Sequence, residues 1–153
     1  MKIAIAADHG GFPLKATVKN LLESLGHEVL DLGAHAYDQA DDYPDFARYV
    51  GQAIQHKQAD RGIILCGSGV GAAVAANKLR GVRACVCHDV YSAAQGVEHD
   101  DLNVLCLGAR VIGDEVLKLL VAGFVNAAFS GEERHRRRLE KVNAMEASGG
   151  GAV

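Results

Sequence analysis

Five short apolar runs recur along the chain, separated by longer segments of mixed polarity. The runs are mostly continuous and rich in valine, isoleucine and leucine, and they span residues 2–7, 27–32, 61–66, 83–87 and 103–108. Continuous apolar runs of this length are typical of strands that are buried on both faces of a parallel sheet. The pattern therefore predicts five buried strands.

The intervening segments have the spacing of amphipathic helices. In the first, Leu14, Val18 and Leu22 share one side, Pro13 stands near the start and Gly26 follows the end. The other predicted helices span 44–58, 70–79, 90–99 and 114–129, and a basic helix spans 132–147. Because connections between parallel strands are almost always right-handed, this alternation predicts helices on both faces of the sheet. The fold class is α/β, a Rossmann-like three-layer sandwich with a five-stranded parallel sheet and a C-terminal basic helix.

Length, charge and hydropathy limit the domain count and the partners. The 153 residues contain no internal repeat, so we expect a single domain over 1–147 and a disordered tail over 148–153. Charged residues make up 23% and the net charge is -3, whereas a nucleic-acid-binding protein normally carries a basic surface. The first apolar run is too short for a signal peptide or a membrane span. We therefore expect a cytoplasmic protein that binds neither nucleic acid nor membrane, but a small molecule or another copy of itself.

Polar residues follow the predicted strands, at the edge where open parallel sheets bind ligands. After the successive strands come Asp8 and His9, a loop with Asp42 and Tyr43, the segment 66–69, His88 and Asp89, and Arg110. His99 and Asp100 precede the fifth strand instead. These two residues reach the same edge only through loop geometry or from a neighbouring subunit.

The segment CGSGVGAAVAANK at 66–78 allows three interpretations. Gly67, Gly69 and Ala72 match the loose form of a dinucleotide-binding motif with Asp89 as its ribose-binding acid, although the motif lies on the third strand and little chain follows it. The glycines also suit a tight structural turn. In the third interpretation, Cys66 faces a helix N-terminus and free amides, which favour its thiolate form and can stabilise an oxyanion on a substrate.

Ser68 supports the third interpretation, because its hydroxyl can pass a proton between neighbouring oxygens. A base, a proton relay and oxyanion donors within one turn are the groups that proton abstraction next to a carbonyl requires. The other cysteines, Cys85, Cys87 and Cys106, are expected as core residues rather than metal ligands.

Five segments are together specific to one family: KIAIAADHGGFPLK, DYPDFA, GIILCGSGVGAAVAANKLRGVRA, SAAQGVEHDDLNVLCLGARVIG and RHRRRLEKV. With them the chain resembles the ribose-5-phosphate isomerase B and galactose-6-phosphate isomerase family from Met1 to about Met145. The resemblance implies an aldose–ketose isomerisation of a phosphorylated sugar through an enediolate, with no organic cofactor and no metal. It also implies a homo-oligomer, a dimer or tetramer, whose active sites are shared between subunits.

The resemblance assigns roles to particular residues. Cys66 matches the base that moves a proton between C1 and C2, Ser68 the proton shuttle between O1 and O2, and His99 the ring-opening histidine. Substrate contacts are implied for Asp8, His9, the amides of Gly67, Gly69 and Gly71, Asp100, Arg110, Arg134 and Arg138. Tyr43 is expected to contact the substrate as well, because of its place after the second strand. Arg134 and Arg138 also lie four residues apart on one helix side, as a phosphate clamp requires, although such a charge run equally suits a solvated face.

The chain departs from the family at Asp100, where an asparagine usually follows the ring-opening histidine. An ionised carboxylate only accepts hydrogen bonds, so its contacts to substrate oxygens must differ from those of an amide. The leading substrate pair is ribose 5-phosphate and ribulose 5-phosphate. The alternatives are an isomerase of erythrulose 4-phosphate or of a hexose 6-phosphate, and a non-catalytic Rossmann-like module that binds a sugar phosphate or a nucleotide.

Overall fold

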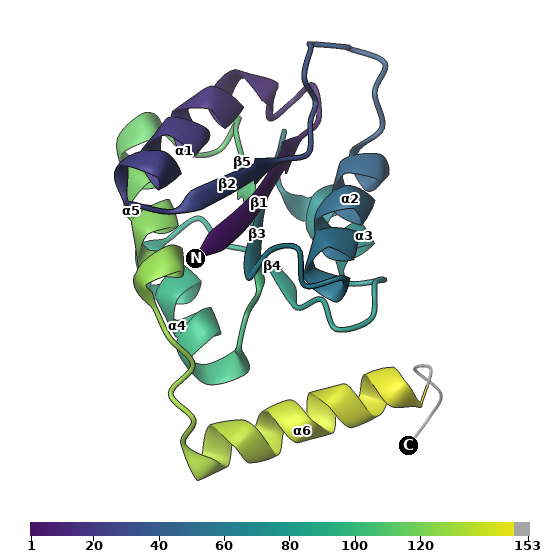
Figure 1. Ribbon diagram of the computed structural model, residues 1–153, viewed down its shortest axis with the longest axis vertical. Helices are drawn as coiled ribbons and strands as arrows, with labels where there is room; N and C mark the ends of the chain where they lie inside the picture. Colours follow the sequence, from purple (N-terminus) through teal and green to yellow (C-terminus); the bar gives the residue numbers. More distant parts are fainter. Residues whose placement is uncertain (149–153) are drawn as a thin grey trace.

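All five predicted strands form in the computed structural model, which describes residues 1–148 (Figure 1). They are β1 (Lys2–Ala7), β2 (Glu28–Asp31), β3 (Arg61–Cys66), β4 (Ala84–Val86) and β5 (Val104–Gly108). Every pairing between them is parallel, and the strand order is β2-β1-β3-β5-β4. The predicted α/β class with a five-stranded parallel sheet is confirmed.

The helices also follow the predicted pattern. They are α1 (Phe12–Ser24), α2 (Tyr43–Gln55), α3 (Val70–Ala76), α4 (Val90–Asp100), α5 (Asp114–Asn126) and α6 (Glu133–Ala147). The bounds shift from the predicted ones by a few residues at most. The largest shifts lie at helix C-termini. Helix α3, for example, ends at Ala76, and the side chain of the next residue, Asn77, donates to the carbonyl groups of Ala73 and Ala84.

Alternate side chains of the strands pack into two separate hydrophobic cores, one on each face of the sheet. On β1, Ile3 and Ile5 pack with α1, α4 and α5, whereas Ala4 and Ala6 pack with α2 and α3. Figure 1 shows these two groups of helices on opposite sides of the sheet. Because both faces are covered, the strands are apolar at nearly every position, which is why they appear in the sequence as continuous runs.

The sheet has a switch point between β1 and β3. From β1 the chain moves outward to β2 and then returns past β1 to β3, while the later strands lie on the far side of β3. A crevice opens beyond the C-terminal ends of the two strands at such a point, and ligands of open α/β sheets bind there. Asp8 follows β1 and Gly67 follows β3 at this place.

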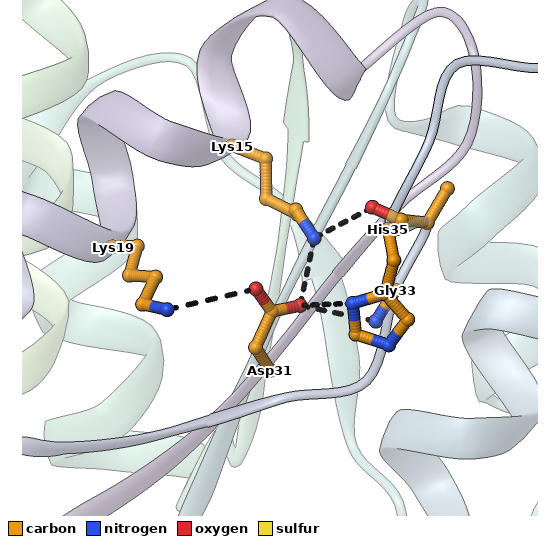
Figure 2. Close-up of polar contacts among 6 residues, drawn as sticks. Lys15, Lys19, Asp31, Gly33 and His35 are labelled. Carbon is orange, nitrogen blue, oxygen red and sulfur yellow. Dashed lines mark hydrogen bonds and ion pairs between the residues drawn. The ribbon is translucent and has the colours of Figure 1, made fainter.

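A partly buried ion pair ties α1 to the loop that begins after β2 (Figure 2). The Nζ atom of Lys15 donates to Asp31 Oδ1 and to the carbonyl oxygen of Ala34, both at 2.7 Å. The amide of Gly33 donates to the same carboxylate oxygen at 3.1 Å, and Lys19 Nζ lies 3.9 Å from Oδ2. These contacts fix the start of the loop that leads to the switch point.

Helix α6 lies outside the three layers and runs across one end of the molecule, at the bottom of Figure 1. Its only buried side chain is His135, and Glu146 accepts a hydrogen bond from the amide of Gly81, just before β4. The helix therefore lies at the end of the sheet where β4 and β5 begin. The predicted disordered tail begins at Ser148, whose amide donates to the carbonyl oxygen of Ala144 and so caps the end of α6. The rest of that tail, 149–153, lies outside the described residues. Within residues 1–148, no helix has the length and apolar character that crossing a membrane requires.

Candidate active site

A cavity of about 380 Å³ lies at the switch point, beyond the C-terminal ends of β1 and β3. It is lined by Asp8, Tyr43, Cys66, Gly67, Ser68, Gly71, Arg110 and Val111. All of these residues except Val111 were predicted as site residues. The structure thus brings together residues from four separate segments of the chain.

The turn after β3 places backbone amides around the sulfur of Cys66. Gly69 has a φ of 82°, a left-handed conformation that favours glycine, and its amide donates to Cys66 Sγ at 3.0 Å. The amide of Val70 donates to Ser68 Oγ at 3.3 Å. Gly71 lies in the first turn of α3, where amide groups have no partner within the helix. The thiol and the hydroxyl are therefore held by the same turn that offers amides to a ligand.

Glycine is also needed in this turn because neighbouring groups occupy the space of a side chain. A Cβ on Gly71 would lie 2.8 Å from the ring of Tyr43, and one on Gly67 would lie 3.6 Å from the guanidinium group of Arg110. On the facing loop, a Cβ on Gly10 would lie 2.7 Å from the amide nitrogen of Gly67. Tyr43 can therefore line the cavity in this position only because Gly71 carries no side chain, whereas the distance from Gly67 to Arg110 is an ordinary contact.

Acidic and basic groups meet at the end of β1. Burial raises the pKa of the Asp8 carboxyl, although the hydrogen bond from the amide of Gly11 and the charge of His9 oppose the increase. A hydrogen bond with Asp41 raises the pKa of His9, against the effects of burial and of the Arg110 charge. The net effect is a raised pKa for His9, which directly follows the cavity residue Asp8 but does not itself line the cavity.

Four predicted site residues lie elsewhere in the chain: His99, Asp100, Arg134 and Arg138. His99 is near the C-terminus of α4, where its Nδ1 atom is 2.7 Å from Gln95 Nε2 and its ring stacks on that of His135 with the centroids 4.0 Å apart. This helix ends where β5 begins, and β5 alone spans about 13 Å at about 3.3 Å per residue. His99 therefore cannot meet Cys66 within one chain, and the expectation that a neighbouring subunit supplies it stays a prediction.

The arginines of α6 are exposed to solvent. Arg134 pairs with Glu132 at 2.8 Å, and Arg138 is exposed four residues further along the helix. Asp100 lines a second and larger cavity of about 500 Å³, which lies between α6 and the segments around β4. This second cavity contains none of the residues of the Cys66 turn.

One expectation from the sequence is wrong in detail, and one residue was missed. Asp89, the ribose-binding acid of the dinucleotide interpretation, accepts a hydrogen bond from the amide of Ser92 and so caps α4. Cys85 is exposed rather than in the core, because β4 is an edge strand. Asp41, which binds His9, was not singled out; the only signal for it is its place beside Asp42 in the long loop.

The fold and the cavity define an α/β protein with a candidate small-molecule site at a switch point, where a thiol, a hydroxyl and backbone amides lie beside the guanidinium group of Arg110. Comparison with known proteins identifies the family. The model of the family described as Ribose/Galactose Isomerase matches residues 3–142. The chain belongs to this family and is a sugar-phosphate isomerase.

Individual relatives cover nearly the whole chain. Ribose-5-phosphate isomerase B of Escherichia coli (strain K12) is 42% identical over 145 residues, which are 95% of this chain and 96% of that protein. D-erythrulose-4-phosphate isomerase of Pectobacterium atrosepticum is 40% identical over 134 residues, 86% of each chain.

Solved structures show the same fold. Ribose-5-phosphate isomerase B of Clostridium thermocellum has a TM-score of 0.93 and 42% identity, covering 97% of this chain and 99% of that one. The enzyme of the same name from Mycoplasma genitalium, solved with bound ribulose-5-phosphate, has a TM-score of 0.90 and 40% identity, covering 95% of this chain and 96% of that one.

Proposed function

We propose that this chain interconverts ribose 5-phosphate and ribulose 5-phosphate through an enediolate formed in the cavity at the switch point. The observation that carries the proposal is the shared lining of this cavity by Cys66, Ser68, the glycine amides and Arg110. The similarity to ribose-5-phosphate isomerase B over nearly the whole chain supports the choice of sugar.

In the proposed reaction, the thiolate of Cys66 takes the proton from C2 of the open-chain aldose. The electron pair of that C–H bond forms the C1–C2 double bond, and the carbonyl electrons move to O1, which becomes an oxyanion. Amides of the turn donate to the developing charge, and such donors typically supply about 3–4 kcal/mol of transition-state stabilisation. Ser68 passes a proton from O2 to O1, and the thiol then returns its proton to C1, which leaves the carbonyl on C2.

His9 and Arg110 on this chain are proposed to bind the phosphate group. Both lie at the end of the sheet that holds the cavity, and a phosphate monoester is a dianion near neutral pH. Arg110 lines the cavity and His9 directly follows the lining residue Asp8, so a phosphate held between them would leave C1 and C2 of the sugar toward the thiol. Asp8 is buried beside them and is proposed to contact a substrate hydroxyl.

Ring opening is proposed to need a second copy of the chain, because His99 is far from Cys66 within one copy. In this step the C1–O4 bond of the furanose breaks, and O4 keeps the electron pair and takes a proton from the imidazolium group of His99. The O1 hydroxyl gives its proton to water, and the electron pair of that O–H bond forms the C1=O1 double bond of the open-chain aldose. We propose that His99, Arg134 and Arg138 enter the site from a neighbouring subunit. The exposed position of both arginines is compatible with this arrangement.

A second candidate substrate is erythrulose 4-phosphate. The 40% identity to the Pectobacterium atrosepticum isomerase of that sugar favours it, as does the carboxylate at Asp100, whose contacts to a sugar hydroxyl differ from those of an amide. Both candidates use the same proton transfer and differ only in chain length.

Proton NMR in deuterated water tests the reaction and the substrate together. Wild type is expected to exchange deuterium into the carbon beside the carbonyl of ribose 5-phosphate, faster than into erythrulose 4-phosphate or allose 6-phosphate. Cys66→Ala is expected to lose turnover by at least about 100-fold, the usual contribution of a general base, while still binding the sugar phosphate. Cys85→Ala is the matched control, since this exposed thiol lies outside the cavity.

The outcomes separate the alternatives. Faster turnover of erythrulose 4-phosphate would reassign the substrate and keep the mechanism. Turnover by Cys66→Ala close to that of wild type would remove this thiol from the role of base. If no sugar phosphate is turned over and none raises the melting temperature, the proposed function is wrong, because a bound ligand must stabilise the folded state.

A further inference from the structure

The strongest unexplained contact near the cavity joins His9 to Asp41. One carboxylate oxygen, Asp41 Oδ1, accepts from the backbone amide of His9 at 3.0 Å and lies 2.7 Å from its Nδ1 atom. Asp41 comes from the long loop before α2, 32 residues away in sequence. Its side chain is only 11% exposed, and its other carboxylate oxygen, Oδ2, is buried without a hydrogen-bond partner among residues 1–148.

This geometry determines how His9 can serve a ligand. Because Nδ1 is engaged by a carboxylate, it carries a proton, and only Nε2 is left to interact with a substrate. The backbone amide of His9 donates to the same oxygen, which also holds the point where the side chain leaves the backbone. A doubly anchored carboxylate therefore sets both the tautomer and the direction of the ring.

The charged groups around His9 come from three segments. Asp41 of the loop and Asp8 at the end of β1 favour the imidazolium form, whereas the Arg110 guanidinium group after β5 disfavours it. Burial also disfavours the charged ring. The hydrogen bond with Asp41 is the largest of these effects, so the pKa of His9 is raised.

We propose that Asp41 is a positioning residue that holds the His9 ring by its Nδ1 atom, so that Nε2–H is free to donate to the substrate phosphate together with Arg110. This inference rests on the proposed binding of a phosphorylated sugar in the cavity. Asp41 is itself negatively charged and would repel an anion. It can therefore strengthen the binding of a phosphate group only through its contact with His9.

Inorganic sulfate is a suitable probe, because it is a dianion that does not titrate between pH 5.5 and 8.5. Its inhibition constant against ribose 5-phosphate would be measured over this range for wild type and Asp41→Asn. We expect Asp41→Asn to bind sulfate about tenfold more weakly near pH 8, the size of one lost charge-assisted hydrogen bond, and we expect this difference to shrink as the pH falls below the ordinary histidine pKa of about 6.5. KM for ribose 5-phosphate should rise near pH 8 while kcat changes by less than about twofold.

Asp38→Asn is the matched control, since it removes the same charge from an exposed position of the same loop. A second measurement follows the His9 ring by NMR, assigned with His9→Gln. Its titration midpoint should fall in Asp41→Asn and stay unchanged in Asp38→Asn. This readout does not depend on catalysis.

A double-mutant cycle gives the decisive outcome. In the His9→Gln background, Asp41→Asn should no longer weaken sulfate binding near pH 8, and removal of a negative charge should strengthen it slightly. An equal loss in both backgrounds, or an unchanged His9 titration, would overturn the role of Asp41 even if wild type turns over the sugar phosphate. Absence of any turnover by wild type would instead overturn the proposed function.

Discussion

The turn after β3 depends on residues outside it, and Gly10 shows this most clearly. A Cβ at position 10 would lie 2.7 Å from the amide nitrogen and 3.0 Å from the Cα of Gly67, both backbone atoms that cannot rotate away. The end of β1 and the turn of Cys66 are therefore packed backbone to backbone. Small displacements at either segment must move the other.

Gly10→Ala is accordingly expected to damage catalysis more than folding. Overpacking costs about 1–3 kcal/mol of stability, whereas a shift of about 1 Å in reacting groups can lower the rate about 100-fold. We expect the melting temperature to fall by several degrees and kcat/KM for ribose 5-phosphate to fall by at least about tenfold, as measured by thermal unfolding and steady-state kinetics. Gly113→Ala is the control, because a Cβ there meets nothing within 4 Å and φ is -87°; similar losses in both variants would contradict this prediction.

At the scale of elements, the ion pair between Lys15 and Asp31 links α1, β2 and the loop that carries Asp41 (Figure 2). Burial by itself would raise the pKa of Asp31. Hydrogen bonds from Lys15 and Gly33, with the charges of Lys15 and His35, outweigh burial and lower that pKa below its ordinary value of 3.8. The folded state therefore favours the carboxylate, and the pair stabilises the protein wherever Asp31 is ionised.

Lys15→Met should lower the free energy of unfolding by about 1–3 kcal/mol at pH 7, because it leaves a half-buried carboxylate without its main partner. The sign of the pH dependence follows from the lowered pKa. The difference from wild type should be fully present above about pH 4 and should shrink as the pH falls further through the pKa of folded Asp31.

Urea unfolding between pH 7 and pH 3 measures this difference. Lys19→Met is the control, since Lys19 lies 3.9 Å from Asp31 and its side chain is 39% exposed. Such an exposed pair contributes less than about 1 kcal/mol. A loss for Lys19→Met as large as that for Lys15→Met would show that the effect is one of general surface charge.

The elements themselves could be predicted well, and their arrangement less so. Strands such as 2–7 and 61–66 are evident from their apolar runs, because both faces of the sheet are covered. The strand order β2-β1-β3-β5-β4 is not encoded in those runs, since five buried strands have similar patterns. The Cys66 turn could be predicted from local sequence, whereas the contact of Asp41 with His9 depends on how a long loop folds back over β1.

The predicted site residues of the whole molecule form two groups that lie at opposite ends of the sheet. Cys66 and Arg110 lie at the C-terminal end of the sheet, while His99 and the arginines of α6 lie at the other end. The sequence order already indicated this, because His99 precedes β5. If the two groups work in one site, each site must contain residues from two copies.

Mixing two inactive variants tests this arrangement. Cys66→Ala lacks the proposed base, and His99→Asn lacks the proposed ring-opening group, so each alone should be nearly inactive toward ribose 5-phosphate. In a two-fold symmetric dimer with shared sites, a mixed dimer has one site with both defects and one site with none. Random exchange of subunits should therefore restore about one quarter of the wild-type activity.

The matched control is a mixture of Cys66→Ala with Ser68→Ala. Both residues belong to the same turn, so every mixed dimer carries one defect in each site and activity should stay low. Restored activity in the first mixture but not in the second requires that Cys66 and His99 of different chains act on one substrate. If neither mixture regains activity although subunit exchange is verified by differently tagged copies, His99 does not serve the cavity of a neighbouring subunit. Ring opening would then have to depend on groups within one chain or occur in solution before the sugar binds.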